Sequence, residues 1–247
     1  MPLNLITDPW VPVRRSDDGL RIIRPDQIAQ PGVIFPDWPR ADLNVACLEL
    51  LIGLVFLADP PAHAQDWRAR KPDVQRLRDR RAPLAPAFNL TGAGPCFLQD
   101  LDPLAGAPNP SDMLFIDSAG GNTARNNAGL MVRRNRYPEP DLPLAAMALY
   151  ALQAHAPSGG AGNRTSMRGG GPMVMLADPG TGRLRDLVWA NVLDGRTTGP
   201  KALPWMCPTR TSEARGSEVY PTWPILPRRS SACCAGCGWL AMPRSPA

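Results

Sequence analysis

Proline limits the length of regular elements in this chain more than any other residue type. The 247 residues include 30 prolines, roughly twice the usual share. Because proline lacks a backbone N–H and clashes with the preceding helical turn, it ends or kinks most elements in which it falls. We therefore expect short elements joined by turns. Aromatic residues make up only 6% of the chain, so the core should draw on Leu, Ala, Val and Ile.

The longest apolar run covers residues 43–58 and predicts a helix. Asp42 is a candidate N-cap, and the D-P-P sequence at 59–61 should end the helix. The run is apolar nearly all round, which is typical of a helix inside the core. It is too short to span a bilayer and contains Asn44 and Glu49, so we expect a buried helix and no membrane partner.

Shorter patterns predict further elements of both kinds. Expected extended segments are 4–6, 12–14, 20–23, 88–97 and 173–177, and expected helices are 73–80, 143–155 and 184–193. The turn sequence Asp17-Asp18-Gly19 should join two of the extended segments into an N-terminal hairpin. The order lacks the regular strand–helix alternation of a parallel doubly wound sheet, so the predicted fold class is mixed α+β.

Charge and cysteine usage permit an anionic partner and indicate no metal or cofactor. The net charge of +5 and the isoelectric point near 9.1 are mildly basic. No secretory signal is visible at the N-terminus, which favours the cytoplasm and argues against a disulfide framework. The tail holds a single C-x-x-C within Cys233-Cys234-Ala235-Gly236-Cys237, whereas a structural zinc site needs about four ligands.

No catalytic constellation is apparent. The two histidines, His63 and His155, have no cysteine or serine partner in a recognisable motif, and His155 should cap the carbonyls at the end of a helix. The basic run from Arg76 to Arg81 fits a solvated helix face better than a binding patch.

A glycine-rich stretch, residues 156–172, reads A-P-S-G-G-A-G-N-R-T-S-M-R-G-G-G-P. Glycine lets backbone approach a ligand closely, freed N–H groups can form an anion-binding concavity, and arginine adds forked donors suited to phosphate. A flexible linker is the alternative. The stretch lacks the lysine of a phosphate-binding P-loop and does not open a helix after a strand, so a nucleotide-binding enzyme is poorly supported. The candidate site residues are Gly159, Gly160, Gly162, Asn163, Arg164 and Arg168.

A second polar, basic segment covers residues 118–140 and shows no regular periodicity. Long loops of this kind are usually functional or disordered. The candidate contacts to nucleic acid here are Asn122, Thr123, Arg125, Asn126, Asn127, Arg133 and Arg134.

Four blocks together resemble the CasA family, the large subunit of the type I-E CRISPR surveillance complex called Cascade. The blocks are N-L-I-T-D-P-W-V-P-V at 4–13, the helix at 42–58, the loop at 117–135 and the glycine stretch, which is the strongest match. The resemblance extends from residue 3 to about residue 226, and it implies the α+β N-terminal domain of that family.

The resemblance also implies a function. The family's subunit is not an enzyme; it recognises the protospacer-adjacent motif of double-stranded DNA, mainly from the minor groove, and so starts pairing with guide RNA. Its implied partners are guide RNA, target duplex, the other Cascade subunits and a recruited helicase-nuclease. Protein reads a short motif and base pairing reads the rest, as in other RNA-guided effectors.

Three departures from the family bear on this interpretation. Family members are much longer, and their second half carries a lysine finger, a glutamine wedge and a C-terminal four-helix bundle. Asp141 and Leu144 stand where many members have the cysteines of a C-x-x-C. Residues 227–247 do not resemble the family, which suggests a disordered or out-of-frame tail after a domain at 1–226. A phosphate- or nucleotide-binding enzyme and a non-functional remnant are the alternatives.

Overall fold

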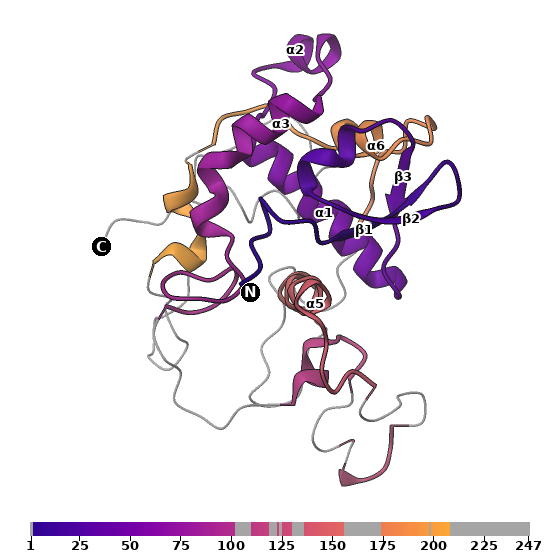
Figure 1. The fold of residues 1–247 in the computed structure, drawn as a ribbon, viewed down its shortest axis with the longest axis vertical. Coiled ribbons are helices and arrows are strands. Elements are labelled where there is room, and N and C mark those ends of the chain that lie inside the picture. Colours follow the sequence, from indigo (N-terminus) through magenta and orange to yellow (C-terminus); the bar gives the residue numbers. More distant parts are fainter. Residues whose placement is uncertain are drawn as a thin grey trace.

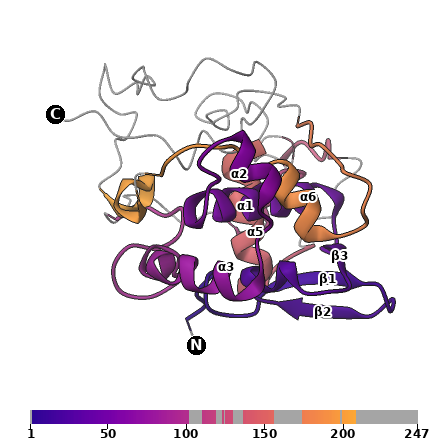
Figure 2. The ribbon, with the colours of Figure 1, turned by 90° about the horizontal axis from the view of Figure 1, so that it is seen from above.

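The computed structural model places an antiparallel sheet and a set of helices around one central helix (Figures 1 and 2). The residues it describes are 2–101, 110–118, 123, 125–129, 136–155, 174–197 and 199–207. Within these residues the fold class is mixed α+β, as the sequence predicted.

The central helix, α1, covers Ala41–Ala58, and every residue from 46 to 57 is buried. By length and composition alone α1 could cross a membrane, but most of it is enclosed by the rest of the fold. The prediction of a buried helix is confirmed, whereas the predicted cap is wrong. Arg40 occupies the N-cap position, and Asp42 lies in the first turn with its carboxylate bound to the Arg40 guanidinium.

The sheet has the strand order β2-β1-β3 and is antiparallel throughout. The hairpin of β1 (Val11–Arg15) and β2 (Leu20–Ile23) confirms the sequence prediction. Its turn holds Asp18 at φ 57, a left-handed conformation that aspartate tolerates better than most residues. The third strand, β3 (Val33–Pro36), was not predicted because its four residues carry no clear alternation.

The described part of the chain forms four further helices. They are α2 (Ala64–Ala69), α3 (Val74–Arg81), α5 (Leu142–His155) and α6 (Leu184–Ala190). The predicted helices at 73–80 and 143–155 agree with α3 and α5 to within one residue at each end. The predicted helix at 184–193 ends early as α6, and α2 was not predicted.

Several proline-containing segments form single turns of 3-10 helix, as the high proline content suggested. Proline stands at the first or second position of four of them, namely Pro25–Ala29, Ala82–Ala87, Pro200–Ala202 and Pro204–Met206. A proline at the start of a helix costs no hydrogen bond, because the first N–H groups have no partner in the helix.

Two predicted strands are wrong. Residues 88–97 form no strand; Phe88 and Phe97 instead pack with Trp205 in an aromatic cluster with ring centroids 5.2–5.5 Å apart. Apolar side chains at the two ends of this segment serve the core without any β-pairing between them. Residues 174–177 are likewise not a strand, and Met173 lies outside the described residues.

The N-terminal segment is held by the side chain of Asn4 rather than by a regular strand. Asn4 makes an isolated bridge with Asn89, and its Nδ2 donates to the Asn89 Oδ1 and the Ala85 carbonyl, both at 2.8 Å. Its Oδ1 accepts the backbone N–H groups of Ile6 at 2.9 Å and Thr7 at 3.1 Å. The Asn4 side-chain amide therefore holds a local turn through its oxygen and binds residues more than eighty positions away through its nitrogen.

We predict that Asn4→Ala lowers the free energy of unfolding by about 2–3 kcal/mol, because each lost hydrogen bond is worth about 1 kcal/mol. Asn4→Asp should cost at least as much, since it keeps the acceptor for Ile6 and Thr7 but places a charged oxygen against the Ala85 carbonyl and the Asn89 Oδ1, close to the Asp8 carboxylate. Urea unfolding of both variants measures the difference. Equal stability of Asn4→Ala and the wild type would contradict this role.

Candidate nucleic-acid interface

Within the polar segment 118–140, the part 118–136 holds all the residues that the sequence predicted there to contact nucleic acid. Residues 111–118 and 136–138 meet at the base of this segment 118–136. The Phe115 and Tyr137 rings are stacked with centroids 4.0 Å apart. The Asp112 Oδ1 accepts the backbone N–H of Tyr137 at 2.8 Å, and the Ser111 hydroxyl donates to the Pro138 carbonyl at 2.8 Å. The two ends of this segment are therefore fixed against each other.

Charged side chains strengthen the contact between residues 111–118 and 136–138. The Asp117 carboxylate pairs with the Arg40 guanidinium and also lies 3.6 Å from the Arg136 Nη1. Arg40 in turn holds the Asp42 carboxylate through two bonds of 2.9 and 3.0 Å. These carboxylates, Asp42 first, raise the pKa of Arg40 above its usual value. The base of the segment is thereby tied to the first turn of α1.

Four of the predicted contact residues in this segment are described. Arg125, Asn126 and Asn127 are exposed, and Thr123 is half-buried. Asn127 has φ 51, a left-handed conformation that asparagine adopts more readily than most residues. The structure thus places three polar side chains at the surface, where a nucleic acid could reach them. The other predicted residues lie outside the described part: Asn122, Arg133, Arg134, Gly159, Gly160, Gly162, Asn163, Arg164 and Arg168.

The described residues before and after the glycine stretch are each bound to the fold. Before it, α5 ends at His155, whose Nε2 lies 3.0 Å from the Glu49 carboxylate. Glu49 is only 4% exposed in the middle of α1. The predicted capping role of His155 is therefore replaced by a side-chain contact with α1. After the stretch, the Asn191 side chain binds both the N–H and the carbonyl of Ala177, at 2.8 and 2.9 Å.

Asp141 has a defined structural role at the start of α5. Its Oδ1 accepts the backbone N–H of Leu144 at 2.8 Å, which caps one of the free N–H groups of the helix. The two residues that the resemblance set against cysteines of a C-x-x-C thus work together as a helix cap. Among the described residues, no group of three or more His, Cys, Asp or Glu side chains could hold a metal ion.

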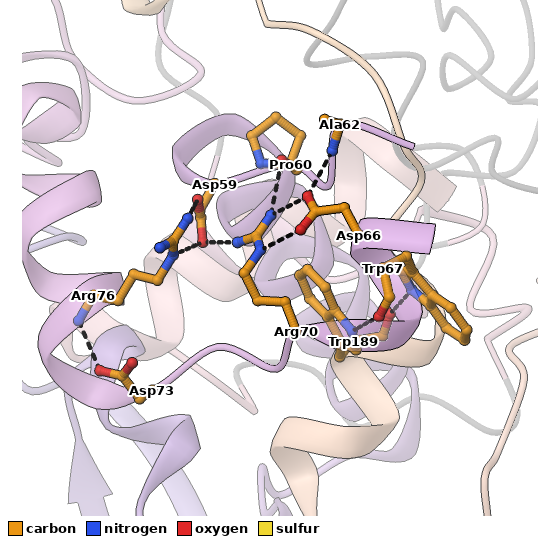
Figure 3. Close-up of polar contacts among 9 residues, drawn as sticks. All are labelled: Asp59, Pro60, Ala62, Asp66, Trp67, Arg70, Asp73, Arg76 and Trp189. Atoms are coloured by element: carbon orange, nitrogen blue, oxygen red, sulfur yellow. Dashed lines mark hydrogen bonds and ion pairs between the residues drawn. The ribbon is translucent and has the colours of Figure 1, made fainter. Parts of the chain in front are cut away.

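Arg70, at the C-terminal end of α2, and Arg76 of α3 bind carboxylates of the fold (Figure 3). Asp59 accepts the Arg76 guanidinium through two bonds, of 2.6 and 2.9 Å, and also pairs with Arg70. Arg70 also donates two hydrogen bonds to the Asp66 carboxylate, and its guanidinium lies over the Trp189 ring, 5.3 Å from the ring centroid. Hydrogen bonding to Asp59 raises the pKa of Arg76. This network joins the end of α1 to α2, α3 and α6.

The same network includes a reciprocal pair of tryptophans. The Trp67 indole N–H donates to the Trp189 carbonyl at 2.9 Å, and the Trp189 indole N–H donates to the Trp67 carbonyl at 3.0 Å (Figure 3). Each indole therefore satisfies its one donor, with the Trp189 ring buried and the Trp67 ring half-buried. This contact fixes α2 against α6.

The expectation that residues 76–81 form a solvated basic face holds for Arg78 and Arg80, which are exposed, and is wrong for Arg81. Arg76 binds Asp59, and Arg78 donates to Asp26 at 3.1 Å. Arg81 is only 1% exposed, and none of its guanidinium nitrogens has a partner within the described part of the chain. Burial lowers the pKa of Arg81 to about 10, an effect that the nearby charge of Asp26 partly opposes.

We predict that Asp66 makes stability depend on acid pH. The hydrogen bond from Arg70, followed by the Ala62 N–H, lowers the pKa of Asp66 to about 2. Because the folded pKa is depressed, the stabilisation is present above an unfolded pKa of about 4 and is lost as the pH falls toward about 2. Urea unfolding of Asp66→Asn should therefore show a shallower decline in stability across this window. Parallel curves for the variant and the wild type would contradict the assignment.

Comparison with solved structures defines the class of fold. A CRISPR-associated protein Cse1 from Acidimicrobium ferrooxidans matches with a TM-score of 0.59 at 19% identity, over 85% of this chain and 44% of that one. A CRISPR-associated protein from Thermus thermophilus matches with a TM-score of 0.58 at 20% identity, over 85% and 43%. Thermobifida fusca Cse1 matches with a TM-score of 0.52 at 19% identity, over 62% of this chain and 30% of that one. The fold is therefore that of part of a Cse1 protein.

Sequence comparison then identifies the family. The family model for CRISPR-associated protein Cse1 matches residues 4–227, so the chain belongs to the Cse1 (CasA) family. No curated protein matches the sequence. The chain spans less than half the length of the solved structures named above. The matched region contains both predicted nucleic-acid segments.

Proposed function

We propose that this chain is a non-catalytic subunit of a CRISPR RNA-guided surveillance complex in the cytoplasm, where it contacts the protospacer-adjacent motif of target duplex DNA. Its partners on this proposal are guide RNA, the duplex, the other Cascade subunits and a recruited helicase-nuclease. The observation that carries the proposal is the family match over residues 4–227, which includes the segment 118–136 and the glycine stretch.

The chemistry of the two segments supports a different role for each: contact with the minor groove for the glycine stretch and contact with phosphate for the segment 118–136. The minor groove of DNA is narrow, about 6 Å wide, so a backbone without side chains fits where bulkier residues would clash. Gly159, Gly160 and Gly162 provide such a backbone. The exposed polar side chains of the segment 118–136 suit sequence-independent contacts to phosphate. The element before the glycine stretch is the helix α5, whereas a dinucleotide-binding loop follows a strand, which disfavours the nucleotide-binding alternative.

We predict that Gly160→Leu weakens binding to motif-bearing duplex by about 1–3 kcal/mol, the typical cost of one mismatched base pair in a specific site. The measurement is an electrophoretic mobility shift with the chain assembled on its complex and guide RNA. A duplex with a scrambled motif provides the control, and its weaker binding should change little. Normal discrimination between the two duplexes by Gly160→Leu would show that the stretch is only a linker.

We predict that the double variant Arg133→Ala, Arg134→Ala lowers the slope of log affinity against log salt concentration by about two, one for each lost phosphate contact. The control is Arg68→Ala, Arg80→Ala, which removes the same charge from exposed positions on α2 and α3. Its slope should stay near that of the wild type. Equal slopes for the two double variants would exclude a specific role for Arg133 and Arg134.

A further inference from the structure

One face of the sheet carries three exposed apolar side chains. Leu20 and Ile22 of β2 are 68% and 64% exposed, and Phe35 of β3 is 37% exposed. The strand register places Leu20 and Phe35 on either side of Arg14, and Ile22 follows Leu20 by two residues, so all of them share one face. Apolar side chains that gather on a surface in this way mark an interaction site.

The backbone of β2 is unpaired on its outer side. The carbonyls of Gly19 and Ile23 accept N–H groups from the ends of β1, at 3.0 and 3.1 Å, so both carbonyls face β1. Because successive residues of an antiparallel strand point their backbone groups to alternate sides, those of Leu20 and Ile22 point away from β1. The strand lies at the edge of the sheet, and Figure 2 shows no described element beyond it.

The charge of Arg21, between these two residues, decides which kind of strand fits this edge. Arg21 is exposed and has no ion pair within the described part of the chain. A second copy of β2 could use all the outward backbone groups only by pairing Leu20 of one copy with Ile22 of the other. That register sets the two copies of Arg21 directly opposite each other, and like charges in this position destabilise an antiparallel pair. A strand with a carboxylate at this position is favoured instead.

We propose that β2 binds an extended, acidic segment of another protein, which adds a fourth strand to the sheet. Two apolar residues of this segment lie opposite Leu20 and Ile22 in an antiparallel pairing and bond to their outward N–H and carbonyl groups. An aspartate or glutamate between them lies opposite Arg21. The pattern that β2 recognises is therefore apolar, acidic, apolar. This inference goes beyond the proposed function and does not depend on contact with nucleic acid.

The probe is the capped peptide Thr-Val-Glu-Val-Thr, titrated into the isotope-labelled full chain and followed by NMR. The amide signals of Leu20 and Ile22 should shift and their hydrogen exchange should slow, whereas exchange of the Arg21 N–H, which faces β1, should change little. The peptide Thr-Val-Lys-Val-Thr should bind about fivefold more weakly, because its charge opposes Arg21. Methylating both valine nitrogens should abolish binding, while methylating the glutamate nitrogen, which points away from β2, should preserve it.

Variants of the chain complete the test. Arg21→Glu should reverse the preference between the two charged peptides, and the matched control Arg68→Glu, at an exposed position on α2, should keep it. Ile22→Pro removes only an outward N–H and should abolish binding; if it does not fold, Arg21→Glu still decides. Equal affinity of the wild type for the two peptides, or unchanged exchange at Leu20 and Ile22, overturns the inference. A dimer of the free chain that Ile22→Pro dissociates also overturns it, because a second copy then occupies β2.

Discussion

Burial of α1 is the constraint on which the rest of this structure depends. A helix that is apolar on nearly all sides cannot face water on any side, so other elements must cover it all round. Helices α3, α5 and α6 and strand β3 all contact it. The short, proline-limited elements elsewhere have little stability of their own, because isolated short helices are marginal in water. They gain it by packing against this one long helix.

The few polar residues of α1 and its two ends then determine where the other segments attach. Arg40 at the start binds the base of the segment 118–136, and Glu49 in the middle binds the last residue before the glycine stretch. Asp59 at the end binds arginines of α2 and α3. A buried charge is costly unless it is paired, so each of these contacts has one strongly favoured geometry. The core helix thereby binds described residues that lie next to each of the two proposed nucleic-acid segments.

The sequence predicted those parts of the fold whose signals lie within a few residues of one another. Helices α1, α3 and α5 and the hairpin carry their periodicity and turn residues locally. The sequence could not indicate pairings over long separations, such as Asn4 with Asn89 or Trp67 with Trp189. The prediction of a strand at 88–97 was wrong, because a run of apolar residues that fill the core has the same pattern as a buried strand when the pairing partner is unknown. Of the candidate site, Arg125 and its two neighbours are exposed, and the ion pair between Asp117 and Arg40 had no local signal in the sequence.

The blocks that resemble the family differ in what they contribute. The block 4–13 is explained by the fold alone, since Asn4 organises its own turn and the buried Trp10 donates to the Leu5 carbonyl at 2.9 Å. Its match therefore indicates shared architecture and carries no information about nucleic acid. In the segment 118–136, by contrast, the described asparagines are exposed. A role for this segment in nucleic-acid binding stays a proposal, whereas packing and hydrogen bonds already account for the N-terminal block.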